Sequence, residues 1–147
     1  MKPHFLKSSV IAVGLLCAMN TVHAQNARPL QSGEKVYQQV CLACHATGIA
    51  QAPKVGDVSA WKPLIAEGQA TLTGHAWAGV RAMPAQGGAP KLSLEEFARA
   101  VAWMARQSGG NWNDPDADTL KAIRKEARER LQKDFAARKK LLEEPGR

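Results

Sequence analysis

Residues 41–45 of the chain are Cys41-Leu42-Ala43-Cys44-His45, a Cys-x-x-Cys-His sequence. One helical turn separates the two thiols, so each sulfur can form a thioether with one of the two vinyl groups of a haem. The imidazole of the next residue then projects toward the haem iron. The motif predicts one covalently attached haem c, bound through Cys41 and Cys44, with His45 as an axial iron ligand.

Three other interpretations of the motif are less favoured. A structural zinc site needs four ligands, and after residue 24 the chain offers only His75 as a further histidine or cysteine. A redox dithiol of the thioredoxin type is expected in a βαβ setting, which the sequence lacks. A plain disulfide can form in an oxidising compartment, but it gives His45 no role. Haem attachment is therefore the favoured interpretation.

Met83 is the best candidate for the second axial ligand of the iron. It lies in the irregular segment 81–84, Arg-Ala-Met-Pro, where a rigid loop can hold a thioether over the far face of the haem. Methionine opposite histidine favours reduced iron and raises the reduction potential, as suits an electron carrier. The alternatives are that Met83 merely fills a gap in the core or that His75 binds instead. Met104 lies in the apolar stripe of a helix and is expected in the core.

Residues 1–24 have the features of a secretory signal peptide. A basic start precedes the apolar segment 10–19, and Val22-His23-Ala24 gives the small-x-small pattern of a cleavage site. The apolar segment is shorter than the roughly 20 residues that span a membrane. We expect cleavage after Ala24 and export to the periplasm; an uncleaved anchor is the alternative.

The remaining sequence predicts an all-α fold. Ser32 is a helix cap, and a helix is expected from residue 33 into the haem motif. Ser93 and Glu96 form a capping-box pattern before a second helix, which ends at residues 108–110. Between these helices we expect the following segments: a loop over 46–58, patchy helix over 61–80 with breaks at Gly68 and Gly74, and irregular chain over 83–90.

A charged helical extension is expected at the C-terminus. Residues 114–116 give a helix start, and Leu120, Ile123, Ala127, Leu131 and Phe135 then form one narrow apolar stripe. Residues 119–140 carry nine basic and three acidic side chains. A solvated charged helix is the favoured interpretation, and contact with a partner complex or an anionic membrane surface is the alternative.

Composition is consistent with one small domain. The chain has 147 residues, a formal charge of +7 and only 5% aromatic residues, so a bulky cofactor would complete a sparse core. We therefore predict a signal peptide at 1–24, a haem domain at 25–110 and an extension at 111–147.

The sequence resembles the class I cytochromes c and, among them, the cytochrome c5 family. The resemblance covers roughly residues 30–107. The residues that carry it are Gly33-Glu34-x-Val36-Tyr37, Cys41-x-x-Cys44-His45-Ala46-Thr47-Gly48, Ala52-Pro53-Lys54-Val55-Gly56-Asp57, Trp61, Met83-Pro84 with Gly87-Gly88, and Ala100-Val101-Ala102-Trp103-Met104.

This resemblance implies several contacts. The helix around Gly33 would cross the helix around Trp103 at close range, the Pro53 carbonyl would accept the free N–H of His45, and Trp61 would lie near the haem propionates. The chain departs from the family in two places. The cysteine pair that many members carry after the glycine pair is absent at 89–91, and the extension has no counterpart.

The function that follows is electron transfer without substrate chemistry. We expect a monohaem periplasmic carrier that exchanges electrons with a redox protein donor and a redox protein acceptor. The alternative is a haem subunit of a larger respiratory or oxidoreductase complex, attached through residues 119–140. An enzyme or gas sensor would need an open iron position, which ligation by both His45 and Met83 would remove. Nucleic acid is not an expected partner of an exported haem protein.

Overall fold

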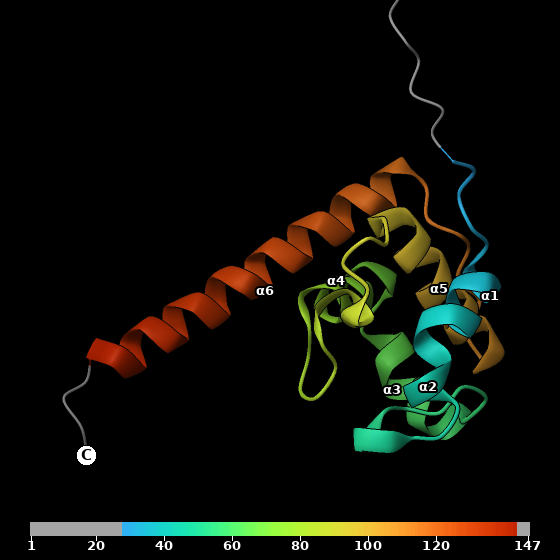
Figure 1. The fold of residues 1–147 in the computed structure, drawn as a ribbon, viewed down its shortest axis with the longest axis horizontal. Coiled ribbons are helices and arrows are strands. Elements are labelled where there is room, and N and C mark those ends of the chain that lie inside the picture. The colour runs from blue at the N-terminus through green and yellow to red at the C-terminus, as the bar shows by residue number, and fades with distance from the viewer. Residues whose placement is uncertain (1–27, 144–147) are drawn as a thin grey trace, which may run out of the picture.

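The computed structural model describes residues 28–143, and the predicted signal peptide lies outside them. Within that range the chain is helical, and its only β-type pairing is an isolated bridge between Val80 and Met83 (Figure 1). The all-α prediction is confirmed. In the described part, no helix is both long and apolar enough to span a membrane. The elements in chain order are α1 (Gly33–Val36), a π-helical turn (Tyr37–Cys41), α2 (Leu42–His45), a 3-10 turn (Ile49–Gln51), α3 (Val58–Ala66), α4 (Gln69–Ala78), a second 3-10 turn (Ala85–Gly88), α5 (Leu94–Gln107) and α6 (Ala117–Glu143).

The N-terminal helical run crosses α5, as the family resemblance implied. Ser32 caps α1, because its hydroxyl accepts a hydrogen bond from the backbone N–H of Lys35. Gly33 lies directly on α5, where a Cβ atom would overlap the carbonyl oxygen of Arg99. One turn later, the rings of Tyr37 and Trp103 lie 4.6 Å apart between centroids. Glycine therefore sets the close approach of the two helices.

The apolar core is built around α5. Phe97, Val101 and Met104 are each at most 3% exposed, and Met104 is a core residue as predicted. The same cluster contains Cys41 and Trp61, and Met83 packs against it. The core thus connects the haem motif to the loop that carries Met83.

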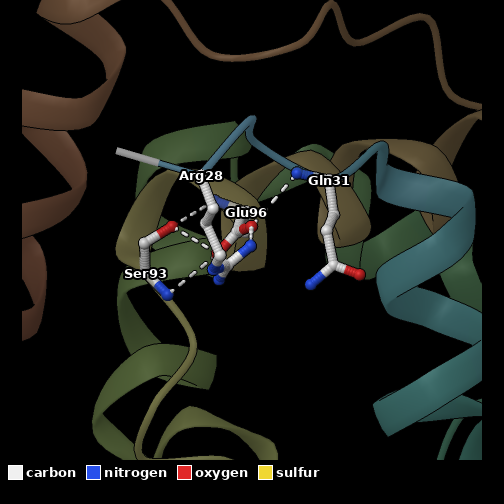
Figure 2. Close-up of polar contacts among 4 residues, drawn as sticks. All are labelled: Arg28, Gln31, Ser93 and Glu96. Atoms are coloured by element: carbon white, nitrogen blue, oxygen red, sulfur yellow. Dashed lines mark hydrogen bonds and ion pairs between the residues drawn. The ribbon is translucent and has the colours of Figure 1, made fainter. Parts of the chain in front are cut away.

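A buried carboxylate joins the N-terminal segment to the start of α5 (Figure 2). Glu96 is fully buried and completes the capping box with Ser93, as predicted. Its carboxylate also accepts hydrogen bonds from Arg28 Nη2 at 2.7 Å and from the backbone N–H of Gln31 at 3.1 Å. These bonds, that of Arg28 foremost, lower the pKa of Glu96 to about 2. The segment before α1 is therefore attached to α5 by an ion pair.

Of the two helix breaks predicted within 61–80, the one at Gly68 is confirmed and the one at Gly74 is wrong. Gly68 has a φ of +90° and separates α3 from α4, as expected. Gly74 does not break α4. It is buried against α6, where a Cβ atom would lie 2.6 Å from the Cβ of Glu126. Its function is close helix packing, which the sequence pattern alone does not distinguish from a break.

The C-terminal helix α6 begins at Ala117, after Asp116 accepts the backbone N–H of Thr119 at 2.8 Å. Its first half packs on α4 and buries Ile123 and Ala127. Its second half extends past the other helices (Figure 1), and Phe135 there is 71% exposed. One side of the first half of α6 is thus buried against α4, whereas the second half is largely solvated, as expected. The division of the chain at residue 110 stays a prediction.

Candidate haem site

The three motif residues lie on one continuous helical segment. Cys41 ends the π-helical turn, and Cys44 and His45 lie in α2. Cys41 is buried in the core cluster, Cys44 is exposed, and both are free thiols. Burial, with a smaller contribution from Cys44, raises the pKa of the Cys41 thiol to about 11. The pair therefore has one sulfur in the apolar interior and one at the surface.

The imidazole of His45 is held by one specific hydrogen bond. Its Nδ1 lies 2.9 Å from the carbonyl oxygen of Pro53. A carbonyl oxygen only accepts, so Nδ1 must carry the proton and donate it. The lone pair of Nε2 is then free for a metal, which is the arrangement expected of a metal-binding histidine. This contact confirms the one that the family resemblance implied.

The segment from Pro53 to Gly56 is itself fixed by hydrogen bonds from both sides. The backbone N–H of Val55 donates to the His45 carbonyl at 2.8 Å, and Trp61 Nε1 donates to the Lys54 carbonyl at 2.9 Å. The backbone N–H of Gly56 donates to the hydroxyl of Ser108, which is fully buried at the end of α5. Residues 53–56, called the strap below, are therefore fixed in place and hold the His45 ring in one orientation.

Two of these contacts involve side chains for which the sequence indicates no such role, those of Trp61 and Ser108. Trp61 is buried and its indole supports the strap; its expected place near the haem propionates stays a prediction. Ser108 was interpreted only as part of a helix stop. Serine before a glycine pair is an ordinary helix end, so no signal in the sequence indicated its bond to the strap.

Met83 is presented by a short, internally bonded hairpin. Val80 and Met83 exchange two backbone hydrogen bonds, of 3.1 and 2.9 Å. At the start of this hairpin Gly79 has a φ of +94°, and a Cβ atom there would lie 3.0 Å from the backbone nitrogen of Ala85. The partly buried Met83 side chain packs against the core cluster that contains Cys41. The loop is thus fixed by hydrogen bonds at Met83, the candidate for the second axial ligand. Axial ligation by Met83 stays a prediction.

His75 lies on α4, and the contact that its ring makes is with Glu67. Its side chain is 30% exposed, and its Nδ1 is 3.7 Å from a carboxylate oxygen of Glu67. Residues 28–143 contain no group of three or more His, Cys, Asp or Glu side chains that could hold a metal ion. The donors at the motif are therefore two thiols and one imidazole.

This donor set fits a covalently bound haem. Two unpaired thiols one helical turn apart suit the two vinyl groups, and an imidazole with a blocked Nδ1 can present Nε2 to the iron. The thioether of Met83, on the rigid hairpin, supplies a donor of the kind found opposite histidine in electron-carrying haem proteins.

Comparison with known proteins agrees with this geometry. The family model described as "Cytochrome C oxidase, cbb3-type, subunit III" matches residues 28–104. Cytochrome c-555 of Chlorobaculum tepidum (strain ATCC 49652 / DSM 12025 / NBRC 103806 / TLS) is 37% identical over 108 residues, which cover 71% of this chain and 96% of that protein. The chain belongs to the class I c-type cytochromes. Proteins of this class carry covalently bound haem c and transfer electrons.

Two further comparisons concern the cytochrome domain alone. Cytochrome c5 of Azotobacter vinelandii is 38% identical over 78 residues, covering 51% of this cytochrome and 93% of its relative. A solved chain from the "electron transfer complex of nitrite reductase with cytochrome c" is 41% identical, with a TM-score of 0.50. It covers 52% of this cytochrome, and the match spans 93% of that chain. The family assignment and the all-α cytochrome fold expected from the sequence are thereby confirmed.

Proposed function

We propose that this cytochrome is a periplasmic one-electron carrier whose single haem is attached at Cys41 and Cys44 and ligated by His45 and Met83. When bound, the haem supplies the Fe(III)/Fe(II) couple. The observation that carries the proposal is the hydrogen bond from His45 to Pro53, because it leaves one imidazole nitrogen, in one orientation, for the iron.

The residues of this chain act by holding the ligands in place. The strap at 53–56 fixes the His45 ring through backbone and indole hydrogen bonds. The hairpin at 80–83 holds the Met83 thioether against the core. Two protein ligands on rigid supports leave no iron position for a substrate, which supports a carrier rather than an enzyme.

The sequence supports the proposed periplasmic location, and a similar solved chain supports the proposed class of partner. The predicted signal peptide, with cleavage after Ala24, supports export, although it lies outside the described residues. We propose redox proteins as donor and acceptor, since a solved chain 41% identical comes from an electron transfer complex of nitrite reductase with cytochrome c. Basic charge on the mature protein would steer it toward acidic docking surfaces, with rates that fall as salt rises.

The proposed ligands can be tested by the absorption spectra of the oxidised and reduced haem protein. Met83→Ala should abolish the weak charge-transfer band at the red edge of the oxidised spectrum and lower the reduction potential. The matched control is Met104→Leu, a conservative change of a buried core methionine, which should leave band and potential in place. A band that survives Met83→Ala, or a wild-type protein that is already high-spin, would contradict this assignment.

A second candidate function is a haem subunit of a larger oxidoreductase. The description of the matching family model, which names a subunit of an oxidase, supports it. The two functions differ in how the partner is held. A carrier should associate weakly and in a salt-sensitive way, whereas a subunit should co-purify with its complex through a high-salt wash.

A further inference from the structure

An open groove lies where α6 leaves the globular part of the cytochrome. It has a volume of about 480 Å³, and Trp77, near the end of α4, forms one wall. The other lining residues belong to α6 and include Ala127, Leu131 and Phe135. Leu131 and Phe135 are 52% and 71% exposed, so residues 28–143 leave this apolar surface largely uncovered. None of the proposed haem ligands lines the groove.

The rim of this groove is positively charged and has no carboxylate of its own. Arg124 and Arg128 line it, both are exposed, and neither forms an ion pair with any residue from 28 to 143. Three other cations of α6 do pair within the helix, in Lys125–Glu129, Arg130–Asp134 and Lys139–Glu143. Unpaired arginines beside an exposed aromatic side chain form a surface that a carboxylate-bearing apolar ligand would complement.

We propose that this groove is the docking site for an acidic amphipathic helix of a partner protein. A bulky apolar side chain of that helix would enter between Trp77 and Phe135. Carboxylates on the flanks of the same helix would pair with Arg124 and Arg128. The proposal rests on the groove and its charge, and it is independent of which residues ligate the iron.

The spacing of the charges favours a protein helix over a membrane surface. Trp77 lies on α4 and Phe135 in the second half of α6, so the apolar lining comes from two elements. Arg124 and Arg128 are one helical turn apart, a spacing that carboxylates one turn apart on a partner helix can match, whereas a bilayer offers a continuous layer of headgroups. Charge disfavours a second copy of this chain through its own α6, because residues 119–140 carry nine basic and three acidic side chains.

The site also lies close to the Met83 hairpin along the chain. Trp77 is two residues before Gly79, whose backbone packs against Met83 and Ala85. A helix seated against Trp77 would therefore rest beside the loop that we propose to hold the iron ligand.

The test uses the complete haem protein and a synthetic helical peptide with a leucine stripe flanked by glutamates. We expect micromolar binding by titration calorimetry and a shift of the Trp77 indole N–H resonance. Phe135→Ser and Arg128→Glu should each weaken binding by about tenfold or more. The matched control is Lys133→Glu, which makes the same charge change at an exposed position of α6 outside the groove, and it should change affinity less than about threefold.

Three kinds of result would overturn the proposal. The first is failure to bind the acidic peptide, or equal weakening by Arg128→Glu and Lys133→Glu. The second is Phe135-dependent binding to phosphatidylglycerol vesicles without binding to the peptide, which would assign the groove to a membrane. The third is Phe135-dependent self-association in sedimentation velocity, which would assign it to a second copy. The mutated side chains are exposed, so loss of folding does not confuse these outcomes.

Discussion

Replacing Glu96 with glutamine should destabilise the cytochrome strongly at neutral pH and hardly at all in acid. The carboxylate is fully buried, and its pKa is lowered from 4.5 to about 2, chiefly by the hydrogen bond from Arg28. Each pKa unit corresponds to about 1.4 kcal/mol, so folding stabilises the ionised form relative to the protonated form by about 3 kcal/mol. This is an upper limit, because the Arg28 side chain is 56% exposed and water screens the pair. We expect Glu96→Gln to cost about 2 kcal/mol at pH 7.

The pH dependence follows from the direction of the shift. The pKa of Glu96 is lower in the folded than in the unfolded protein, so its stabilisation is complete above about pH 4.5 and is lost as the pH falls toward about 2. Urea unfolding of the wild-type and Glu96→Gln haem proteins should therefore give curves that converge across this window. Any loss of haem ligation in acid affects both proteins, so the difference between them reports Glu96.

A matched control lies one residue away. Glu95 has a side chain 31% exposed and pairs with Arg99 one turn along the same helix. Glu95→Gln should cost only about 0.5 kcal/mol at pH 7. The reasoning would be refuted if Glu95→Gln cost as much as Glu96→Gln, or if the Glu96→Gln difference persisted unchanged at pH 2.

Three further substitutions test packing and capping. Gly33→Ala should destabilise the haem protein by about 2–3 kcal/mol in urea unfolding, because its Cβ would overlap the Arg99 carbonyl oxygen; wild-type stability would contradict that close approach. Gly74→Val should separate α6 from α4, so limited proteolysis should cleave α6 first in the variant, and an unchanged digestion pattern would count against the packing described. Ser93→Ala removes the hydroxyl of the capping box and should lower the urea midpoint by an amount equivalent to about 1 kcal/mol, with no change expected in the haem spectrum.

The haem motif and the helix ends were predictable because they depend on neighbouring residues. In Cys-x-x-Cys-His, the helical repeat alone sets the spacing of the two thiols and the imidazole. In the structure these residues lie on one helical segment. Ser32 and Ser93 cap their helices through bonds that span three residues. Side-chain chemistry and local backbone geometry are sufficient for such features.

The support of the site was predictable only in part. The contact between Pro53 and His45 was expected from family resemblance and is present at 2.9 Å. The bond from Gly56 to Ser108, 52 positions apart, was not expected. Serine is common at helix ends whichever partner its side chain meets. Only the folded chain therefore shows that the Ser108 hydroxyl supports the strap.

The sequence by itself determined the helical class, the haem-binding chemistry, the starts of α1, α5 and α6 and the end of α5, because these follow from interactions within a few residues. Tertiary structure alone decided that Arg28 reaches Glu96 across 68 positions, that Gly74 packs α4 on α6 instead of ending a helix, and that Trp77 and Phe135 share a groove. Each of these depends on which helix faces meet in space. A periodic pattern indicates that a face is apolar, but it does not identify the surface that the face covers.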